Sequence, residues 1–406
     1  MKRFFAALLA AFTLFSTVGC GKTEPPSEEP APPPPAEIPA PEVQPPVAEL
    51  LPEPEDPIDQ LLDSMTLEEK VGQLFFVRVP AEDAEEDVSA YHLGGYILFG
   101  RDTKDKTANE IIQNILSYQT AACSTDGVNI PMLIGVDEEG GTVVRISSNP
   151  HLRSKKFLSP RKLFESGGLN AVAAETGEKD LLLQSLGINV NLAPVADICT
   201  DPSAFMYDRS AGETSVATMY VETVVSRMSS DGMGSVLKHF PGYGNNVDTH
   251  TGIAVDDRPL ETFRVTDFLP FTAGIQRGGN LTAVLMSHTI MTAVDAELPA
   301  SLSPSVHDLL RTELEFDGVV MTDDLAMDAV AAYAEDGAVA VMAIEAGNDM
   351  VITTDYRTQI PRVIEAVESG ALSEDRIDAA CRRVLVWKDT LGLLAPDVID
   401  HFRSFS

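Results

Sequence analysis

The stretch "GVVMTDDLAM", residues 318–327, runs from an apolar segment directly into two adjacent aspartates. Val319, Val320 and Met321 form a continuous apolar run, which is typical of a strand buried on both faces of a parallel sheet. Asp323 and Asp324 come where that strand would end. The segment therefore predicts a buried strand with two carboxylates at its C-terminal end.

The same arrangement recurs along the chain, where short apolar segments alternate with longer amphipathic stretches such as 108–121, 214–229 and 305–315. A barrel of parallel strands, each followed by a helix, needs about eight strands. The strand candidates meet that number, and they are 72–79, 95–99, 132–137, 190–196, 235–239, 283–288, 318–322 and 350–354. The sequence predicts an α/β fold, a (β/α)8 barrel of the TIM type, as a single catalytic domain over residues 58–394. Residues 395–406 would be a C-terminal tail.

Polar side chains gather where the predicted strands end. In barrel enzymes the site is built from the C-terminal ends of the strands and the loops that follow them. Caps of the following helices would explain some of these residues, and Asp324 fits a cap as well as a site. Caps do not explain Lys238 and His239. The residues in question are Asp137, Asp197, Arg209, Lys238, His239, Ser287, His288, Asp323 and Asp324.

The fifth predicted strand leads into "KHFPGYGNNVDTHTGI", residues 238–253, in which glycine and proline indicate a loop. This loop carries Asp248 and His250, so three kinds of protein remain possible. One is a glycoside hydrolase with a carboxylate nucleophile and a proton donor. Another is a metal-dependent hydrolase that uses Asp248, His250, His239 and His288 as ligands. The third is a barrel that binds sugar without cleaving it. The chain has no His-x-His on a predicted strand and no His-Glu-x-x-His, which disfavours the metal site.

The bulk composition narrows the classes further. The chain has 406 residues and a formal net charge of -33, which excludes a general nucleic-acid binder with a basic face. A hydrophobic content of 44% with 22% charged residues fits a folded globular body. After Cys20 the cysteines are Cys123, Cys199 and Cys381, with no metal-ligand spacing, and we expect no disulfide framework.

The N-terminus has the pattern of a secretory signal. Lys2 and Arg3 precede an apolar run over residues 4–15, which ends at "TVGC", residues 17–20. Val18-Gly19-Cys20 resembles a bacterial lipoprotein signal, in which the cysteine is lipidated. The alternative is an ordinary secretion signal. Residues 1–20 are therefore predicted to be a lipoprotein signal peptide.

Residues 21–57 are rich in proline and glutamate, and they predict a disordered linker. The predicted location is the extracytoplasmic face of a bacterial cell membrane, with the Cys20 lipid as the membrane contact, or outside the cell.

The stretch "KHFPGYG" with Asp248 and His250 resembles the signature of glycoside hydrolase family 3, in its bacterial β-N-acetylglucosaminidase branch. The common form of that motif has histidine where this chain has Tyr243. The resemblance extends along the predicted barrel. It includes "MTLEEKVGQL" (65–74), "GGYILF" (94–99), "GVDEEGG" (135–141) followed by Val144-Arg145, "NLAPVAD" (191–197) and "TDDLAM" (322–327).

This resemblance implies a retaining exo-β-N-acetylhexosaminidase that needs neither a cofactor nor a metal. Asp323 would be the nucleophile, His250 the general acid/base and Asp248 its partner. The sugar would be held by Asp137, Arg145, Arg209, Lys238 and His239. An imidazole suits the acid/base role, because its pKa near neutrality lets it give and then take a proton.

The implied substrate is an amino-sugar glycan or glycopeptide. Phosphorolysis or β-glucosidase activity within the same family are the alternatives. The residues alone leave several roles open. His288 could be a core histidine or line the site, Asp197 could orient Arg209 or neighbouring loops, and Glu138 could be a helix-start charge or a substrate contact. For Glu139 a charge at a helix start is favoured.

Overall fold

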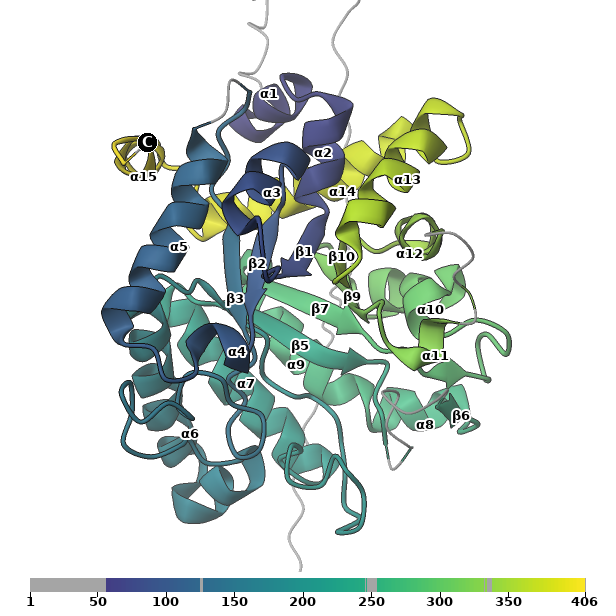
Figure 1. Ribbon diagram of the computed structural model, residues 1–406. Helices are drawn as coiled ribbons and strands as arrows, with labels where there is room; N and C mark the ends of the chain where they lie inside the picture. The colour runs from purple at the N-terminus through teal and green to yellow at the C-terminus, as the bar shows by residue number, and fades with distance from the viewer. Residues whose placement is uncertain are drawn as a thin grey trace, which may run out of the picture. The chain divides into compact units, whose positions relative to one another are not determined.

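The computed structural model describes residues 56–124, 127–244, 246, 254–331, 333 and 338–405 (Figure 1). The predicted signal peptide with Cys20 lies outside the described residues, as does almost all of the predicted linker. Asp248 and His250 also lie outside them.

Eight parallel strands close into a barrel in the order β1-β10-β9-β7-β5-β4-β3-β2. The predicted (β/α)8 barrel is therefore confirmed, and helices surround it (Figure 1). The strands are β1 (Phe75–Arg78), β2 (Gly95–Leu98), β3 (Leu133–Val136), β4 (Val190–Asn191), β5 (Gly234–Phe240), β7 (Thr282–Met286), β9 (Val320–Asp324) and β10 (Met350–Thr353). A separate two-stranded sheet pairs β6 (Val255–Asp256) with β8 (Ile290–Met291).

Several helices begin at residues that suit a helix start. Thr66 and Glu69 form a capping box at α2 (Leu67–Gln73), and Thr107 and Glu110 form another at α5 (Ala108–Cys123). The Ser303 side chain accepts from the Val306 N–H at the start of α10 (Pro304–Asp308). The other helices are α1 (Pro57–Asp63), α3 (Ala84–Tyr91), α4 (Gly100–Thr103), α6 (Pro160–Ser185), α7 (Thr214–Asp231), α8 (Leu260–Val265), α9 (Phe268–Gly278), α11 (Asp328–Ala331), α12 (Val339–Ala346), α13 (Tyr356–Glu368), α14 (Glu374–Thr390) and α15 (Pro396–Arg403).

Two apolar layers hold the barrel together. One lies within it and includes Phe76, Leu133, Val236, Met321 and Ile352, all of which are buried. The other lies between strands and helices and is larger. Each fully buried side chain of this size contributes about 1.5–3 kcal/mol relative to an exposed one. The inner layer fills the interior of the barrel, so the barrel can offer a ligand site at the ends of its strands but not between them.

The predicted boundaries differ from the observed ones in several places. Gly72 and Gln73 belong to α2 rather than to the first strand. The fourth strand ends at Asn191 rather than near residue 196, in a segment where Pro194 has no N–H to donate to a neighbouring strand. The predicted C-terminal tail contains a helix, α15. Among the helices described, none is both long and apolar enough to span a bilayer.

Candidate active site

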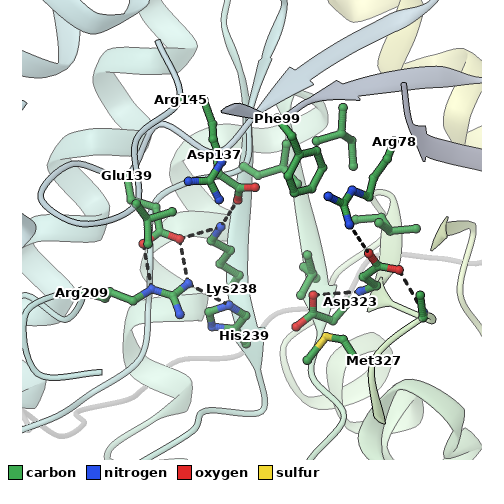
Figure 2. Close-up of a pocket in the computed structure, with 17 residues that line it drawn as sticks. Arg78, Phe99, Asp137, Glu139, Arg145, Arg209, Lys238, His239, Asp323 and Met327 are labelled. Carbon is green, nitrogen blue, oxygen red and sulfur yellow. Dashed lines mark hydrogen bonds and ion pairs between the residues drawn. The ribbon is translucent and has the colours of Figure 1, made fainter. Parts of the chain in front are cut away.

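A pocket of about 450 Å³ lies at the C-terminal ends of the barrel strands (Figure 2). The structure brings the predicted nucleophile and all five predicted sugar-binding residues into its wall. The predicted residues that line it are Asp137, Arg145, Arg209, Lys238, His239 and Asp323. Segments between residues 137 and 323 thus meet at one end of the barrel, as the strand-end pattern predicted.

The two-residue period of a strand explains why several of these side chains point inward. Met321 of β9 lies in the inner apolar layer, so Asp323 faces the same side two residues later. Phe76 and Arg78 of β1 are related in the same way. Lys238 and His239 are consecutive, and both line the pocket. The register between β5 and β7 shifts at this point, an irregularity that can re-aim a side chain.

A buried charge cluster forms one wall of the pocket. The Glu139 carboxylate accepts two hydrogen bonds from Arg209, at 2.9 Å from Nε and 2.8 Å from Nη2. The Lys238 ammonium lies 2.8 Å from the same carboxylate and 2.6 Å from Asp137 Oδ1. Burial would raise the pKa of the Glu139 carboxyl, but the Arg209 guanidinium and the Lys238 ammonium hold it well below its usual range. The interpretation of Glu139 as a helix-start charge is wrong, since the next helix begins only at Pro160.

Replacing Glu139 by glutamine is expected to destabilise the fold by about 3 kcal/mol, because it removes the paired carboxylate of the buried Arg209 guanidinium and one of the two carboxylates that pair with Lys238. Urea unfolding of the variant measures this loss. Glu178→Gln is the matched control, since Glu178 is well exposed and pairs with Arg153 at the surface. The control should cost at most about 1 kcal/mol. Equal effects of the two substitutions would contradict a structural role for the cluster.

Asp197 orients His239 and the turn that follows it. Its Oδ2 lies 2.7 Å from His239 Nδ1 and accepts the His239 backbone N–H at 3.0 Å, while its Oδ1 accepts the Tyr243 N–H at 2.7 Å. Arg209 Nη2 lies 3.4 Å from His239 Nε2. A guanidinium can only donate, so in the neutral imidazole Nε2 accepts and Nδ1 carries the proton that is donated to Asp197. Asp197 therefore acts on the histidine and the neighbouring loop, one of the two possibilities that the sequence left open.

The pKa values of the two adjacent aspartates are shifted in opposite directions. Burial tends to raise the pKa of Asp323, but His239, His288, the Asp324 N–H and Lys238 together bring it below its ordinary value. For Asp324, burial dominates and raises the pKa. Asp324 Oδ1 accepts the Ala326 N–H in a turn ahead of α11, so it caps a turn rather than a helix. Asp323 is thus the more readily ionised carboxylate of the pair.

Glu138 supports the pocket from behind. It is fully buried, and its carboxylate accepts the backbone N–H groups of Arg145 at 2.8 Å, Ile146 at 2.8 Å and Ser147 at 3.1 Å. These bonds fix the turn from which Arg145 reaches the pocket. Glu138 is therefore neither a helix-start charge nor a residue that lines the pocket.

Sequence reasoning missed Arg78 and Phe99, which line the pocket opposite the charge cluster (Figure 2). The Arg78 guanidinium stacks on the Phe99 ring at 3.8 Å from its centroid and lies 3.9 Å from Asp324. Arg78 lies one residue before the end of the predicted strand 72–79, and Phe99 is the last residue of the predicted strand 95–99. That position was the available signal, but the resemblance assigned a role to neither residue.

His288 lies away from the wall of the pocket. Its ring is fully buried, with Nδ1 at 2.7 Å from Ser301 Oγ and Nε2 at 3.1 Å from the Asp324 carbonyl oxygen. It is therefore a hydrogen-bonded core histidine. Within the described ranges, no group of three or more His, Cys, Asp or Glu residues is arranged to hold a metal ion.

Comparison with known proteins agrees with this geometry. Residues 66–386 match the family model "Glycosyl hydrolase family 3 N terminal domain". The chain is 31% identical over 333 residues to "Beta-hexosaminidase LpqI" of Mycobacterium tuberculosis, covering 79% of this chain and 82% of the relative. It is 30% identical over 286 residues to the "Beta-hexosaminidase" of Methylococcus capsulatus, covering 68% and 84%.

Solved structures give the same result. A family 3 β-N-acetylglucosaminidase from Paenibacillus superposes with a TM-score of 0.74 at 31% identity and covers 82% of this chain. This chain spans 64% of that protein's length. The structure of M. tuberculosis LpqI superposes with a TM-score of 0.71 at 28% identity, covering 80% of this chain and 94% of that one. By family model, sequence relatives and structure alike, the chain belongs to glycoside hydrolase family 3.

Proposed function

We propose that this β-N-acetylhexosaminidase is a retaining exo-glycosidase that releases terminal β-linked N-acetylglucosamine. Asp323 would form the covalent glycosyl-enzyme, with His250 as general acid/base and Asp248 as its partner. The observation that carries the proposal is the position of Asp323, a carboxylate with a lowered pKa at a rigid strand end, facing a pocket lined by hydrogen-bonding groups. The names of the relatives supply the sugar.

The proposed sugar contacts follow from the donors and acceptors in the pocket. Lys238 and Arg209 can donate to hydroxyl oxygens, and Asp137 can accept from hydroxyl groups. His239 Nε2 is an acceptor that a hydroxyl could reach once a sugar is bound. The Arg145 side chain makes a long hydrogen bond, 3.4 Å from Nη1 to the Val144 carbonyl oxygen. Most of its N–H donors therefore remain for a ligand. Bonds to charged groups are worth about 1.5–3 kcal/mol each, so such a set can orient one sugar ring firmly.

The proposed reaction has two steps. Asp323 attacks the anomeric carbon while His250 protonates the departing oxygen, which breaks the glycosidic bond and leaves an ester. In the second step His250 takes a proton from water, and that water displaces Asp323 from the anomeric carbon. Two inversions restore the β configuration.

Proton NMR during hydrolysis of an aryl β-N-acetylglucosaminide should show the β anomer of N-acetylglucosamine first. The reason is the double displacement, since a single displacement by water would give the α anomer. The assay is run with and without phosphate, because an initial glycosyl phosphate would identify phosphorolysis. An initial α anomer would overturn the covalent route. A faster reaction with the aryl β-glucoside would overturn the preference for the acetamido sugar.

We further propose that residues 1–20 are a lipoprotein signal, that Cys20 carries the lipid, and that residues 21–57 form an extended spacer before the barrel. The support is the sequence pattern: a basic start, an apolar core and Val18-Gly19-Cys20 followed by a proline-rich stretch. This arrangement would hold the enzyme at the outer face of a cytoplasmic membrane.

Cys20→Ser is expected to leave the membrane fraction or to accumulate as an uncut precursor, because the thiol that accepts the lipid is gone. Fractionation and the mass of the mature protein measure this. Cys199→Ser is the control, since this thiol is buried in the barrel domain and should not affect targeting. Normal processing and membrane retention of Cys20→Ser would show that the anchor lies elsewhere.

A further inference from the structure

A second cavity, of about 250 Å³, adjoins the catalytic pocket. It lies over the C-terminal ends of the neighbouring strands β2, β1 and β10, on the same face of the barrel as the catalytic pocket. Arg78 lines both cavities and so marks the place where they meet. The described lining of this second cavity comprises Arg78, residues 79–81, Arg101, Thr354, Tyr356 and Arg357.

The charge of this cavity is unusual for the chain. Three guanidinium groups line it and no described acidic side chain does, although the chain as a whole carries a net charge of -33. Arg357 lies in the first turn of α13, where the positive end of the helix dipole adds to the field. The wall is therefore suited to an anion.

The three arginines retain donors for a ligand. Arg357 donates to Asp87 Oδ2 through both Nε, at 3.0 Å, and Nη2, and this Nη2 also lies 3.3 Å from the Glu82 carbonyl oxygen and 3.5 Å from Asp83 Oδ2. Arg101 Nη2 donates to the Val79 carbonyl oxygen, and Arg101 Nε lies 3.4 Å from Asp102 Oδ1. Arg78 approaches Asp324 only to 3.9 Å, which is too long for a hydrogen bond. Each guanidinium has five N–H donors, so these pairs do not exhaust them.

We propose that this cavity binds a carboxylate carried by the leaving group of the substrate, so that the enzyme prefers acidic aglycones. The inference rests on the proposed function. The proposed sugar contacts lie on one side of the pocket and Arg78 lies on the other, with Asp323 between the two (Figure 2). A substrate held by the charge cluster and extending past Asp323 therefore reaches Arg78 with its leaving group.

A carboxylate matches this wall in shape as well as in charge. Its two oxygens fit the planar fork of an arginine, and such paired bonds are stronger and more directional than those of a neutral group. One bond to a charged group commonly changes affinity about tenfold or more. An ester of the same acid keeps the size of the group but loses its charge.

The test compares para-(carboxymethyl)phenyl N-acetyl-β-glucosaminide with its methyl ester, using the full chain. At low ionic strength we expect kcat/KM to be about tenfold higher for the acid. Arg101→Gln should reduce this ratio toward one and leave the rate on the ester unchanged. Arg277→Gln is the matched control, because it removes an exposed arginine that pairs with Glu222. That control should keep the preference.

The wild type provides a check that does not depend on any variant. High salt should weaken the preference for the acid, because it screens the attraction. Equal kcat/KM for acid and ester in the wild type would overturn the carboxylate site while leaving the proposed function supported by cleavage of the ester. A preference that survives in Arg101→Gln and in high salt would also overturn it. If neither compound is cleaved, the proposed function fails. Calorimetry with the same two compounds then tests the carboxylate site, and equal affinities for the acid and the ester would overturn that site.

Discussion

Asp323→Ala should abolish turnover, with kcat reduced on the order of 10⁴-fold or more, while the protein stays folded. The proposed reaction has no substitute for the carboxylate that attacks the anomeric carbon. The side chain accepts the Asp324 N–H at 2.9 Å but packs against the pocket rather than in the apolar layers, so its loss should cost little stability. Large loss of activity with native-like melting is the expected combination.

Asp324→Ala is the control, because it removes the neighbouring carboxyl group of the same strand. Its raised pKa and its bond to the Ala326 N–H give it a local structural role, so we expect a clearly smaller loss of activity. Steady-state kinetics on an aryl glycoside and thermal unfolding are measured for both variants. If Asp324→Ala were inactive and Asp323→Ala retained substantial activity, the nucleophile would be Asp324.

The barrel could be predicted from the sequence because its strands are short, continuous apolar runs that local sequence reveals. Segments such as 318–322 need no knowledge of their neighbours to be recognised as buried strands. Strand ends were less predictable, since they depend on hydrogen bonds to other strands. The fourth strand ends at Asn191 although the apolar run continues to Ala196, and Val195 then makes only an isolated bridge to Lys238.

The site was predictable where a residue stands in a motif and was missed where its role depends on a distant partner. Glu139 gave no local sign of its part in the cluster, because Arg209 lies 70 residues further along the chain. Arg78 was missed for a related reason. Its position between two cavities arises from the closure of the barrel, which brings β1 beside β10. A motif identifies single residues, whereas the combined charge of a pocket wall depends on residues that only the folded chain brings together.

The segment proposed to carry the proton donor starts and ends at anchored residues. On one side Asp197 accepts the Tyr243 N–H. On the other, Arg258 pairs with Asp256 and Asp267, each at 2.8 Å. Asp256 and Asp267 are almost fully buried, whereas the Arg258 side chain that joins them is partly exposed. Asp248 and His250 themselves lie between these two anchors in the sequence, outside the described residues. The role of His250 therefore has to be tested by its chemistry.

His250→Ala is expected to harm substrates unequally. A sugar leaving group needs a proton as its bond breaks, whereas an acidic phenol leaves with little help. Loss of general acid catalysis should therefore slow disaccharide cleavage by about 10²–10⁴-fold and the first step of an activated aryl glycoside much less. With the activated substrate, the second step should become limiting, because no base remains to deprotonate water. The first phenol should appear as a burst, and the apparent KM should fall.

Azide provides the decisive measurement, since it attacks the glycosyl-enzyme without needing a base. It should accelerate His250→Ala with the activated substrate and yield a β-glycosyl azide, but leave the wild type nearly unchanged. Asp248→Asn should fall between His250→Ala and the wild type, because it keeps the imidazole but removes the charge that orients it and stabilises its cation. If good and poor leaving groups lost equally, with neither burst nor azide product, His250 would be a sugar-binding or loop-shaping residue. The proton would then have to come from another group, and the pocket's described carboxyl with a raised pKa, Asp324, would be the next to test.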